Sequence, residues 1–177
     1  MNGPRIPKVE IPEEILKNRS DIVFLVGDEQ FHLSKDSLAS QSAYFQNLLF
    51  GNFRESEKSE IELKDIDSED FHDFVNVLYG KNEIQDSTIE GILFLADMYD
   101  CSSVLEKCET SLMTESKIVI GKKFKLAQQY SMADLKENCL LQTKTSQDVR
   151  SIVNYNSDEL DLSTSNELLL KMLACTL

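Results

Sequence analysis

The sequence predicts an α+β fold, in which strands and helices mix in the first half and helices alone follow. Three observations lead to this expectation. A β-branched apolar run, DIVFLV at 21–26, has the composition of a strand. Apolar residues in 68–79 recur three or four positions apart, as on one face of a helix. Two segments, 95–108 and 126–139, resemble each other at an offset of 31 residues, which is typical of stacked helix pairs.

The opening strand is expected to form a hairpin. GDEQ at 27–30 supplies a turn, and FHL at 31–33 alternates apolar and polar residues. Because IVFLV has no polar position, we expect burial on both faces of this strand. IEL at 61–63 is expected to add a third strand.

Helical spacing follows the hairpin and returns after the third strand. It first links Leu38, Ser42, Phe45 and Leu49, which predicts either one helix or two short helices with Ser42 as the cap between them. The later helix is expected to begin after Asp67 as its N-cap. It should end at Gly80, since glycine tolerates the backbone conformation that terminates helices.

Serine residues mark the predicted starts of three later helices. Ser87 and Glu90 have the spacing of a capping box, in which each side chain satisfies a free amide at the helix start. Ser146 and Ser163 are expected to cap the last two helices.

The repeat pairs LADMYDCSSVLEKC with LAQQYSMADLKENC. Leu, Ala, Tyr and Cys recur in step, and Val104 is matched by Leu135. With two copies visible, a stacked helix pair is indicated rather than a full solenoid. The repeated LAxxY could form a ligand-binding surface, but such residues at helical spacing more often pack in a core.

Composition limits the classes of partner. The chain has 177 residues, room for one compact domain and a small second lobe, and a formal charge of −13. This charge repels nucleic acid and the anionic inner leaflet of a membrane. No apolar run reaches the roughly 20 residues that span a bilayer, and residues 1–20 lack the pattern of a signal peptide. We therefore expect no nucleic-acid partner, no membrane contact and a location in the cytoplasm or nucleus.

Cofactor, metal and catalytic signals are weak. The cysteines are far apart and without a CxxC pair, so we expect buried thiols and no metal site; they are Cys101, Cys108, Cys139 and Cys175. No glycine-rich loop for a phosphate-bearing cofactor follows a strand. His32 and His72 are expected at the surface, and an enzyme would need a deep pocket with one of them beside acidic groups.

Phe53 differs from the other aromatic residues. It follows Gly51 and Asn52 and precedes a polar stretch, so no apolar periodicity places it in the core. Two interpretations stay open. The ring either anchors a partner's groove beside Glu55 or folds back over the preceding helix.

Three motifs together resemble those of a BTB/POZ domain. They are the D-x-x-x-x-V strand from Asp21, the K-x-x-L-A-x-x-S-x-Y-F helix entry from Lys35, and I-x-L-x-D-I followed by F-x-x-F-x-x-x-L-Y at 61–79. The resemblance covers 21–113 and is greatest to MATH-BTB adaptors. It implies a small sheet flanked by a helical cluster. Ser34 replaces the family's usual histidine and still serves as an N-cap.

The resemblance also divides the chain. Residues 1–20 are expected to form an N-terminal segment with a short helix, and 114–177 resemble the helical 3-box or BACK-like extension. A MATH or Kelch recognition domain is absent from the sequence. The chain is then either a piece of a longer adaptor or a BTB-only protein, and its protein substrate is unknown.

Such domains bind the N-terminal region of cullin-3 in RING ubiquitin ligases. The resemblance implies that Phe53, Arg54 and Glu55 form the hydrophobic-x-Glu loop motif of this interface, with Ile118 and Phe124 in the extension completing the groove. The function implied is a noncatalytic, dimeric substrate adaptor. The alternative is a self-association scaffold for transcriptional or cytoskeletal partners without a cullin.

A homodimer is the second expected assembly. The family's use of the N-terminal segment, first strand and first helices implies an interface of Ile15, Leu16, Asp21, Ile22, Lys35 and Leu38. Asp21 and Lys35 occupy positions where BTB domains often carry a charged pair. A strand start and the first turn of a helix explain these two residues nearly as well.

Overall fold

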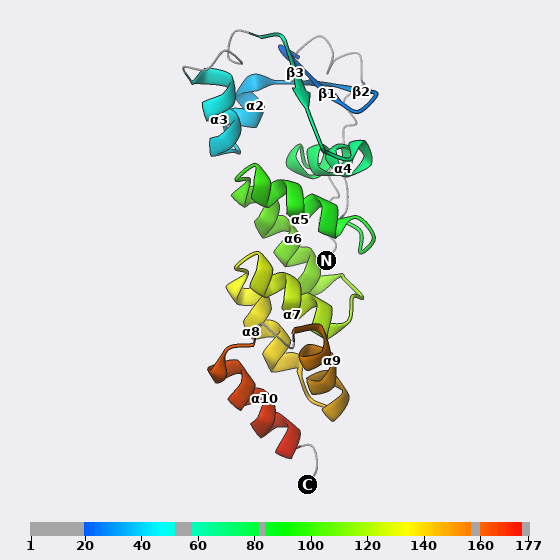
Figure 1. The fold of residues 1–177 in the computed structure, drawn as a ribbon, viewed down its shortest axis with the longest axis vertical. Helices are drawn as coiled ribbons and strands as arrows, with labels where there is room; N and C mark the ends of the chain where they lie inside the picture. Colours follow the sequence, from blue (N-terminus) through cyan, green and yellow to red (C-terminus); the bar gives the residue numbers. More distant parts are fainter. Residues whose placement is uncertain (1–19, 52–57, 82–83, 157–159, 175–177) are drawn as a thin grey trace, which may run out of the picture. The chain divides into compact units, whose positions relative to one another are not determined.

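The computed structural model describes residues 20–51, 58–81, 84–156 and 160–174, in two units that divide between residues 71 and 72 (Figure 1). Unit 1 contains β1 (Ile22–Val26), β2 (Glu29–Leu33), α2 (Lys35–Ala39), α3 (Ala43–Phe50), β3 (Glu60–Leu63) and the first turn of α4 (Ser68–Leu78). Unit 2 contains the rest of α4, then α5 (Ile89–Met98), α6 (Ser102–Thr114), α7 (Ile120–Gln129), α8 (Ala133–Gln142), α9 (Ser146–Asn156) and α10 (Leu162–Ala174). The predicted short helix within 1–20 falls almost entirely outside the described residues.

The sheet of unit 1 has the strand order β2-β1-β3. β1 is antiparallel to β2 and parallel to β3, so that Phe24 lies opposite Phe31 on one side and Ile61 on the other. A two-residue loop joins the hairpin, with Gly27 at φ +59, a conformation that glycine adopts without strain. The hairpin and the third strand are confirmed. The prediction that both faces of β1 are buried is wrong, because the second face, with Val23 and Leu25, is only half-buried.

Four phenylalanine rings form the centre of unit 1. Phe24 on the sheet lies 5.7 Å from Phe45 of α3 and 6.2 Å from Phe71 of α4, between ring centroids. Phe31 meets Phe71 edge to face at 4.9 Å. Such tilted pairs contribute about 0.5–1.5 kcal/mol beyond the area they bury. The aromatic cluster therefore holds the sheet, α3 and the start of α4 together.

The predicted caps in unit 1 are confirmed. The Phe45 amide donates to the Ser42 hydroxyl at 3.0 Å, so the region 35–50 is two helices rather than one. The Asp67 carboxylate accepts from the amides of Glu69 and Asp70 at 2.9 and 3.1 Å. Each side chain satisfies backbone donors that have no partner within the helix.

The predicted repeat corresponds to two helix hairpins, α5–α6 and α7–α8. Both turns end the first helix in the same way. The Cys101 amide donates to the Ala96 carbonyl and the Met132 amide to the Ala127 carbonyl, each at 2.8 Å. The residue before each donor, Asp100 or Ser131, has a positive φ of 50 or 56. This is the Schellman motif, which α4 also uses with Gly80 at φ +70, as predicted.

The capping residues predicted for three helices of unit 2 are wrong. α5 begins after Thr88 without a side-chain cap, and the Glu90 carboxylate accepts from the Lys122 ammonium of α7 instead of closing a capping box. α9 is capped by Thr145, whose hydroxyl accepts from the Asp148 amide at 3.1 Å. α10 is capped by Asp161 rather than Ser163. In α9 and α10 the predicted serine is already a residue of the helix. The cap precedes it, since a capping residue has a non-helical backbone.

Asp161 joins α10 to α8. Its carboxylate accepts from the Thr164 amide at 2.7 Å, the Thr164 hydroxyl at 3.0 Å and the Lys136 ammonium at 3.1 Å. The Thr164 amide, followed by the Lys136 and Thr164 side chains, lowers the pKa of Asp161 from 3.8 to about 2. A carboxyl with a lowered folded-state pKa stabilises the fold above its unfolded pKa, and this stabilisation is lost as the pH falls through the folded pKa.

Asp161→Asn is therefore expected to lower the urea midpoint of unfolding in a pH-dependent way. The gap between wild type and variant should be full above about pH 4 and should shrink as the pH falls toward about 2, where half of the wild-type carboxyl groups are protonated. Urea titrations from pH 2 to 7 measure it. Glu137→Gln, at an exposed position on the adjoining helix α8, is the control. A gap of constant size across this range would show that the charge of Asp161 is not responsible.

The described cysteines are buried thiols, as predicted. Cys101, Cys108 and Cys139 are buried, and burial raises the pKa of Cys108 to about 12 and that of Cys139 to about 11. Cys175 lies outside the described residues. In the part of the chain that the structure describes, no three His, Cys, Asp or Glu side chains come together to hold a metal ion. Over the same residues, no helix combines the length and apolar character needed to cross a bilayer.

Candidate protein-interaction surfaces

The predicted hydrophobic-x-Glu motif falls on a segment that the structure does not describe. Phe53, Arg54 and Glu55 all lie within 52–57. The described residue nearest to them on the N-terminal side is Gly51 at the end of α3. Phe50, the last residue of α3, is 55% exposed, so this helix carries a large apolar side chain into solvent immediately before the motif.

The two residues predicted for the extension differ in position. Ile118 is half-buried in the connection between α6 and α7, and its amide donates to the Ser116 hydroxyl at 3.2 Å. Phe124 is fully buried in unit 2. The prediction that Phe124 contacts a partner directly is therefore wrong, because an interior ring on α7 is needed by the fold. Val119, adjacent to Ile118, is the exposed apolar residue of this connection at 53%.

The predicted dimer residues are also divided between surface and core. Ile15 and Leu16 lie outside the described residues. Ile22 and Leu38 are 1% and 0% exposed, so they belong to the core of unit 1 and offer no surface to a second subunit. Their assignment to the interface is a wrong prediction. Both are apolar residues on the inward side of their elements, where the core of unit 1 requires them.

Asp21 and Lys35 have local structural roles. The Asp21 carboxylate accepts from the Lys35 backbone amide at 2.7 Å, which ties the start of β1 to the first turn of α2. The Lys35 ammonium donates to the Lys58 carbonyl at 3.3 Å. These contacts match the strand-start and first-turn interpretation. A charged pair at a dimer centre stays a prediction.

A surface that the sequence analysis missed lies on α5. Phe94 and Met98, one helical turn apart, are 50% and 43% exposed, and the exposed acids Glu90 and Asp97 lie beside them. We call Phe94 and Met98 the α5 apolar pair. A large aromatic and a methionine exposed together are typical of protein-binding surfaces, where such residues are enriched.

The repeat supplies an internal comparison for the α5 apolar pair. At the offset of 31, the counterparts of Phe94 and Met98 on α7 are Lys125 and Gln129. The buried positions keep their character, since Leu95 and Ala96 correspond to Leu126 and Ala127 and all four are buried. The hairpin fold therefore does not require apolar residues at 94 and 98. Comparing the two copies position by position would have revealed this surface from the sequence.

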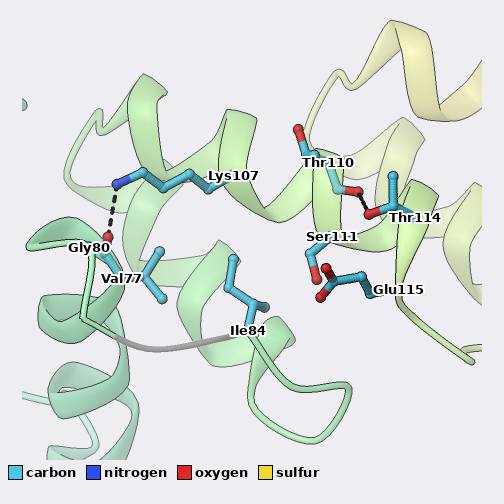
Figure 2. A pocket seen from close by; sticks show the side chains of 8 residues that line it. All are labelled: Val77, Gly80, Ile84, Lys107, Thr110, Ser111, Thr114 and Glu115. Atoms are coloured by element: carbon cyan, nitrogen blue, oxygen red, sulfur yellow. Dashed lines mark hydrogen bonds between the residues drawn. The ribbon is translucent and has the colours of Figure 1, made fainter. Parts of the chain in front are cut away.

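A pocket of about 230 Å³ lies between the end of α4 and α6 within unit 2 (Figure 2). Its lining includes Val77, Ile84, Lys107, Thr110, Thr114 and Glu115. The Lys107 ammonium donates to the Val77 carbonyl at 2.9 Å, and the Thr110 and Thr114 hydroxyls donate to backbone carbonyls one turn earlier at 2.9 and 2.8 Å.

The pocket has no catalytic arrangement. Nucleophilic catalysis requires a side chain hydrogen-bonded to a base, and neither histidine lines this pocket. His32 is half-buried on β2. His72 is exposed on α4 beside Asn76, at 3.2 Å, and Asp73, at 3.6 Å. The Lys107 ammonium binds the last turn of α4 and the two threonine hydroxyls bind carbonyls of their own helix α6, so these three groups have structural roles.

Comparison with known proteins identifies the family. A model of the BTB/POZ domain matches residues 13–116, more than half of the chain. BTB and MATH domain-containing protein 15 of Caenorhabditis elegans is 41% identical over 133 residues, which are 75% of this chain and 49% of that protein. Protein 36 of the same series is 32% identical over 167 residues, or 93% of this chain and 52% of the relative. The chain thus spans about half the length of these curated relatives.

A more distant relative and a solved structure are also similar to this chain. Human Kelch-like protein 28 is 37% identical over 89 residues, which are 50% of this chain and 16% of that protein. The BTB domain of zebrafish PATZ1 covers 56% of this chain and 88% of its own, with 24% identity and a TM-score of 0.45. BTB/POZ domains are noncatalytic protein-interaction modules, as predicted. This chain is a member of the BTB/POZ family, related to the BTB and MATH domain-containing proteins of C. elegans.

Proposed function

We propose that this chain is a noncatalytic adaptor that binds the N-terminal region of cullin-3 and presents a protein substrate to a RING ubiquitin ligase. The observation that carries the proposal is a hydrophobic-x-Glu sequence, Phe53-Arg54-Glu55, in the segment that follows α3 in the sequence of a BTB/POZ domain. Phe53 fills an apolar pocket of the cullin in this proposal, and Glu55 stabilises the loop or meets polar groups at the rim.

The α5 apolar pair is proposed as a second contact. Exposed Phe94 and Met98 supply an apolar area, and Asp97 adds negative charge beside it, whereas the Glu90 carboxylate is paired with the Lys122 ammonium of α7. A partner surface that fits it has an apolar centre and basic residues at its edge. Of the two residues predicted in the extension, Ile118 stays in the proposal, together with the exposed Val119 next to it.

Self-association completes the proposed role. A dimer would hold two substrate-binding sites together and raise apparent affinity through effective concentration. Substrate recognition is assigned to a separate partner or to a recognition segment such as the MATH domain that the names of the relatives include. The proposed place of action is the cytoplasm or the nucleus.

Phe53→Ala is expected to weaken binding to the cullin-3 N-terminal region by about 30-fold or more, since truncating such an anchor costs on the order of 2 kcal/mol. Glu55→Lys should weaken it further through charge reversal. Isothermal titration calorimetry measures both. Tyr155→Ala, which removes an aromatic of 45% exposure from α9, is the control and should bind like wild type.

The second contact has a matched control in the repeat. Phe94→Ala should also weaken binding, whereas Lys125→Ala, at the equivalent position of α7, should not. Equal affinities for both variants would remove α5 from the interface. A wild-type chain that dimerises in light scattering yet ignores cullin-3 would favour the self-association scaffold.

A further inference from the structure

The strand β3 forms one edge of the sheet in unit 1. β1 pairs with it on one side, and among the described residues no strand pairs with its other side. The Val23 amide donates to the Ser59 carbonyl at 2.9 Å, which fixes the direction of the backbone groups along β3. Because these groups alternate between the two sides of a strand, the N–H and C=O of Glu60 and Glu62 point away from β1. They form a template for an additional strand.

The side chains of β3 determine which strand fits this edge. Glu60 and Glu62 are exposed on one face of the sheet, whereas Ile61 is buried and Leu63 half-buried on the core side. A strand added beside β3 would place its own side chains level with these, alternately on the two faces. Basic residues would then meet the two glutamates, and apolar residues would extend the core side past Leu63.

Charge excludes a second copy of this chain as the occupant. Two β3 strands paired with each other would bring the glutamates of both copies together, and like charges at neighbouring strand positions are destabilising. The Glu62 carboxylate lies 4.0 Å from the Lys64 ammonium, but both side chains are largely exposed, so this contact is weak. The glutamates of β3 therefore disfavour an acidic strand and favour a basic one.

We infer that a partner protein adds an extended segment of alternating basic and apolar residues to the sheet beside β3. Backbone hydrogen bonds to Glu60 and Glu62 supply the affinity, and the two rows of side chains supply the specificity. The strand has 4 residues, so the contact is short and its affinity is expected to be modest. This contact uses none of the residues of the proposed cullin-3 interface.

A fluorescent synthetic peptide of alternating lysine and valine is the probe for this edge. The control peptide has the same composition with all lysines before all valines, so it carries the same charge without the alternation. Fluorescence anisotropy should show at least tenfold tighter binding of the alternating peptide to the whole chain. Equal affinities for the two peptides, or no binding of either, would overturn the inference.

Proline substitutions identify which edge of the sheet binds the peptide. Glu62→Pro removes an N–H that points away from β1 and should weaken binding of the alternating peptide at least tenfold. Gln30→Pro is the matched control on β2 and should bind like wild type. The backbone groups of its partner Leu25 face β3, so the Gln30 N–H also points out of the sheet, at the other edge. Equal affinities of the two proline variants would exclude β3 as the site.

Hydrogen exchange of the wild-type chain tests the same contact without any substitution. In the free chain, the amides of Glu60 and Glu62 should exchange at least tenfold faster than those of Ile61 and Leu63, which face β1. The alternating peptide should slow exchange at both glutamates at least tenfold, and the control peptide should not. Unchanged exchange at these two amides would contradict an added strand. These measurements contain no cullin-3, so a failure of this inference is distinguishable from a failure of the proposed function.

Discussion

Phe124→Ala is expected to lower the free energy of unfolding by about 3–5 kcal/mol, the range for truncating a buried phenylalanine. The ring is 0% exposed, and the Lys136 ammonium lies 5.8 Å from its centroid. The alanine variant would lose this cation–π contact and leave a cavity in α7's packing, so the cost should fall at the upper end of the range. Urea denaturation monitored by circular dichroism measures it.

Two control variants test whether the destabilisation comes from the buried position of the ring rather than from the loss of an aromatic side chain. Phe124→Leu keeps most of the volume and should cost less than about 1.5 kcal/mol. Phe94→Ala removes the same ring from a position of 50% exposure and should change stability by no more than about 0.5 kcal/mol. If Phe124→Ala unfolds at the same urea concentration as Phe94→Ala, then the ring of Phe124 is not a core residue.

Gly121→Ala is the second large effect that we expect, with a loss of about 3 kcal/mol. A Cβ at this position would lie 2.2 Å from the Ser151 carbonyl oxygen of α9 and 2.5 Å from its carbon. Backbone atoms cannot rotate away, so α7 and α9 must separate. The separation would strain the hydrogen bonds from the Gly121 amide to the Ser151 hydroxyl and from the Asn156 amide to the Gly121 carbonyl, both 3.2 Å.

The sign of this effect opposes helix propensity. Alanine is favoured over glycine inside a helix by about 1 kcal/mol, so a stabilised Gly121→Ala variant would contradict the close approach of α7 and α9. Ser151→Gly should not rescue Gly121→Ala, because the nearest atoms belong to the backbone. Gly27→Ala is the control, since Gly27 has open space and a φ of +59, and the backbone conformation alone should cost about 1 kcal/mol. Thermal and urea unfolding measure all three.

Periodicity predicted the fold well where one physical requirement decides the structure. The alternation of FHL in β2 follows from one buried face, and Ser42, Asp67 and Gly80 match the donors and the backbone angles that helix ends require. The caps of α9 and α10 were missed because more than one residue near each helix start can serve as a cap. Thr145 lies one residue before Ser146 and Asp161 two residues before Ser163, and all four are plausible capping residues, so local sequence does not choose between them.

The site was less predictable because apolar composition does not say what an apolar residue contacts. Ile22, Leu38 and Phe124 were assigned to interfaces, yet the core requires all three. For Phe124 the repeat holds the missing information. At the offset of 31 its counterpart is Leu93, which is also fully buried.

In α5 the sequence failed to reveal apolar residues that are exposed. ILFLADM is apolar at nearly every position, so its spacing does not reveal which residues face outward. Tertiary packing decides this, and it leaves Phe94 and Met98 exposed while Leu93 and Leu95 are buried.

Calorimetric titration of the wild-type chain with the cullin-3 N-terminal region tests the adaptor role most directly. The proposal predicts a saturable heat of binding and co-elution of the two proteins at gel filtration. A chain that is folded by circular dichroism but gives no heat and elutes apart from cullin-3 would contradict it.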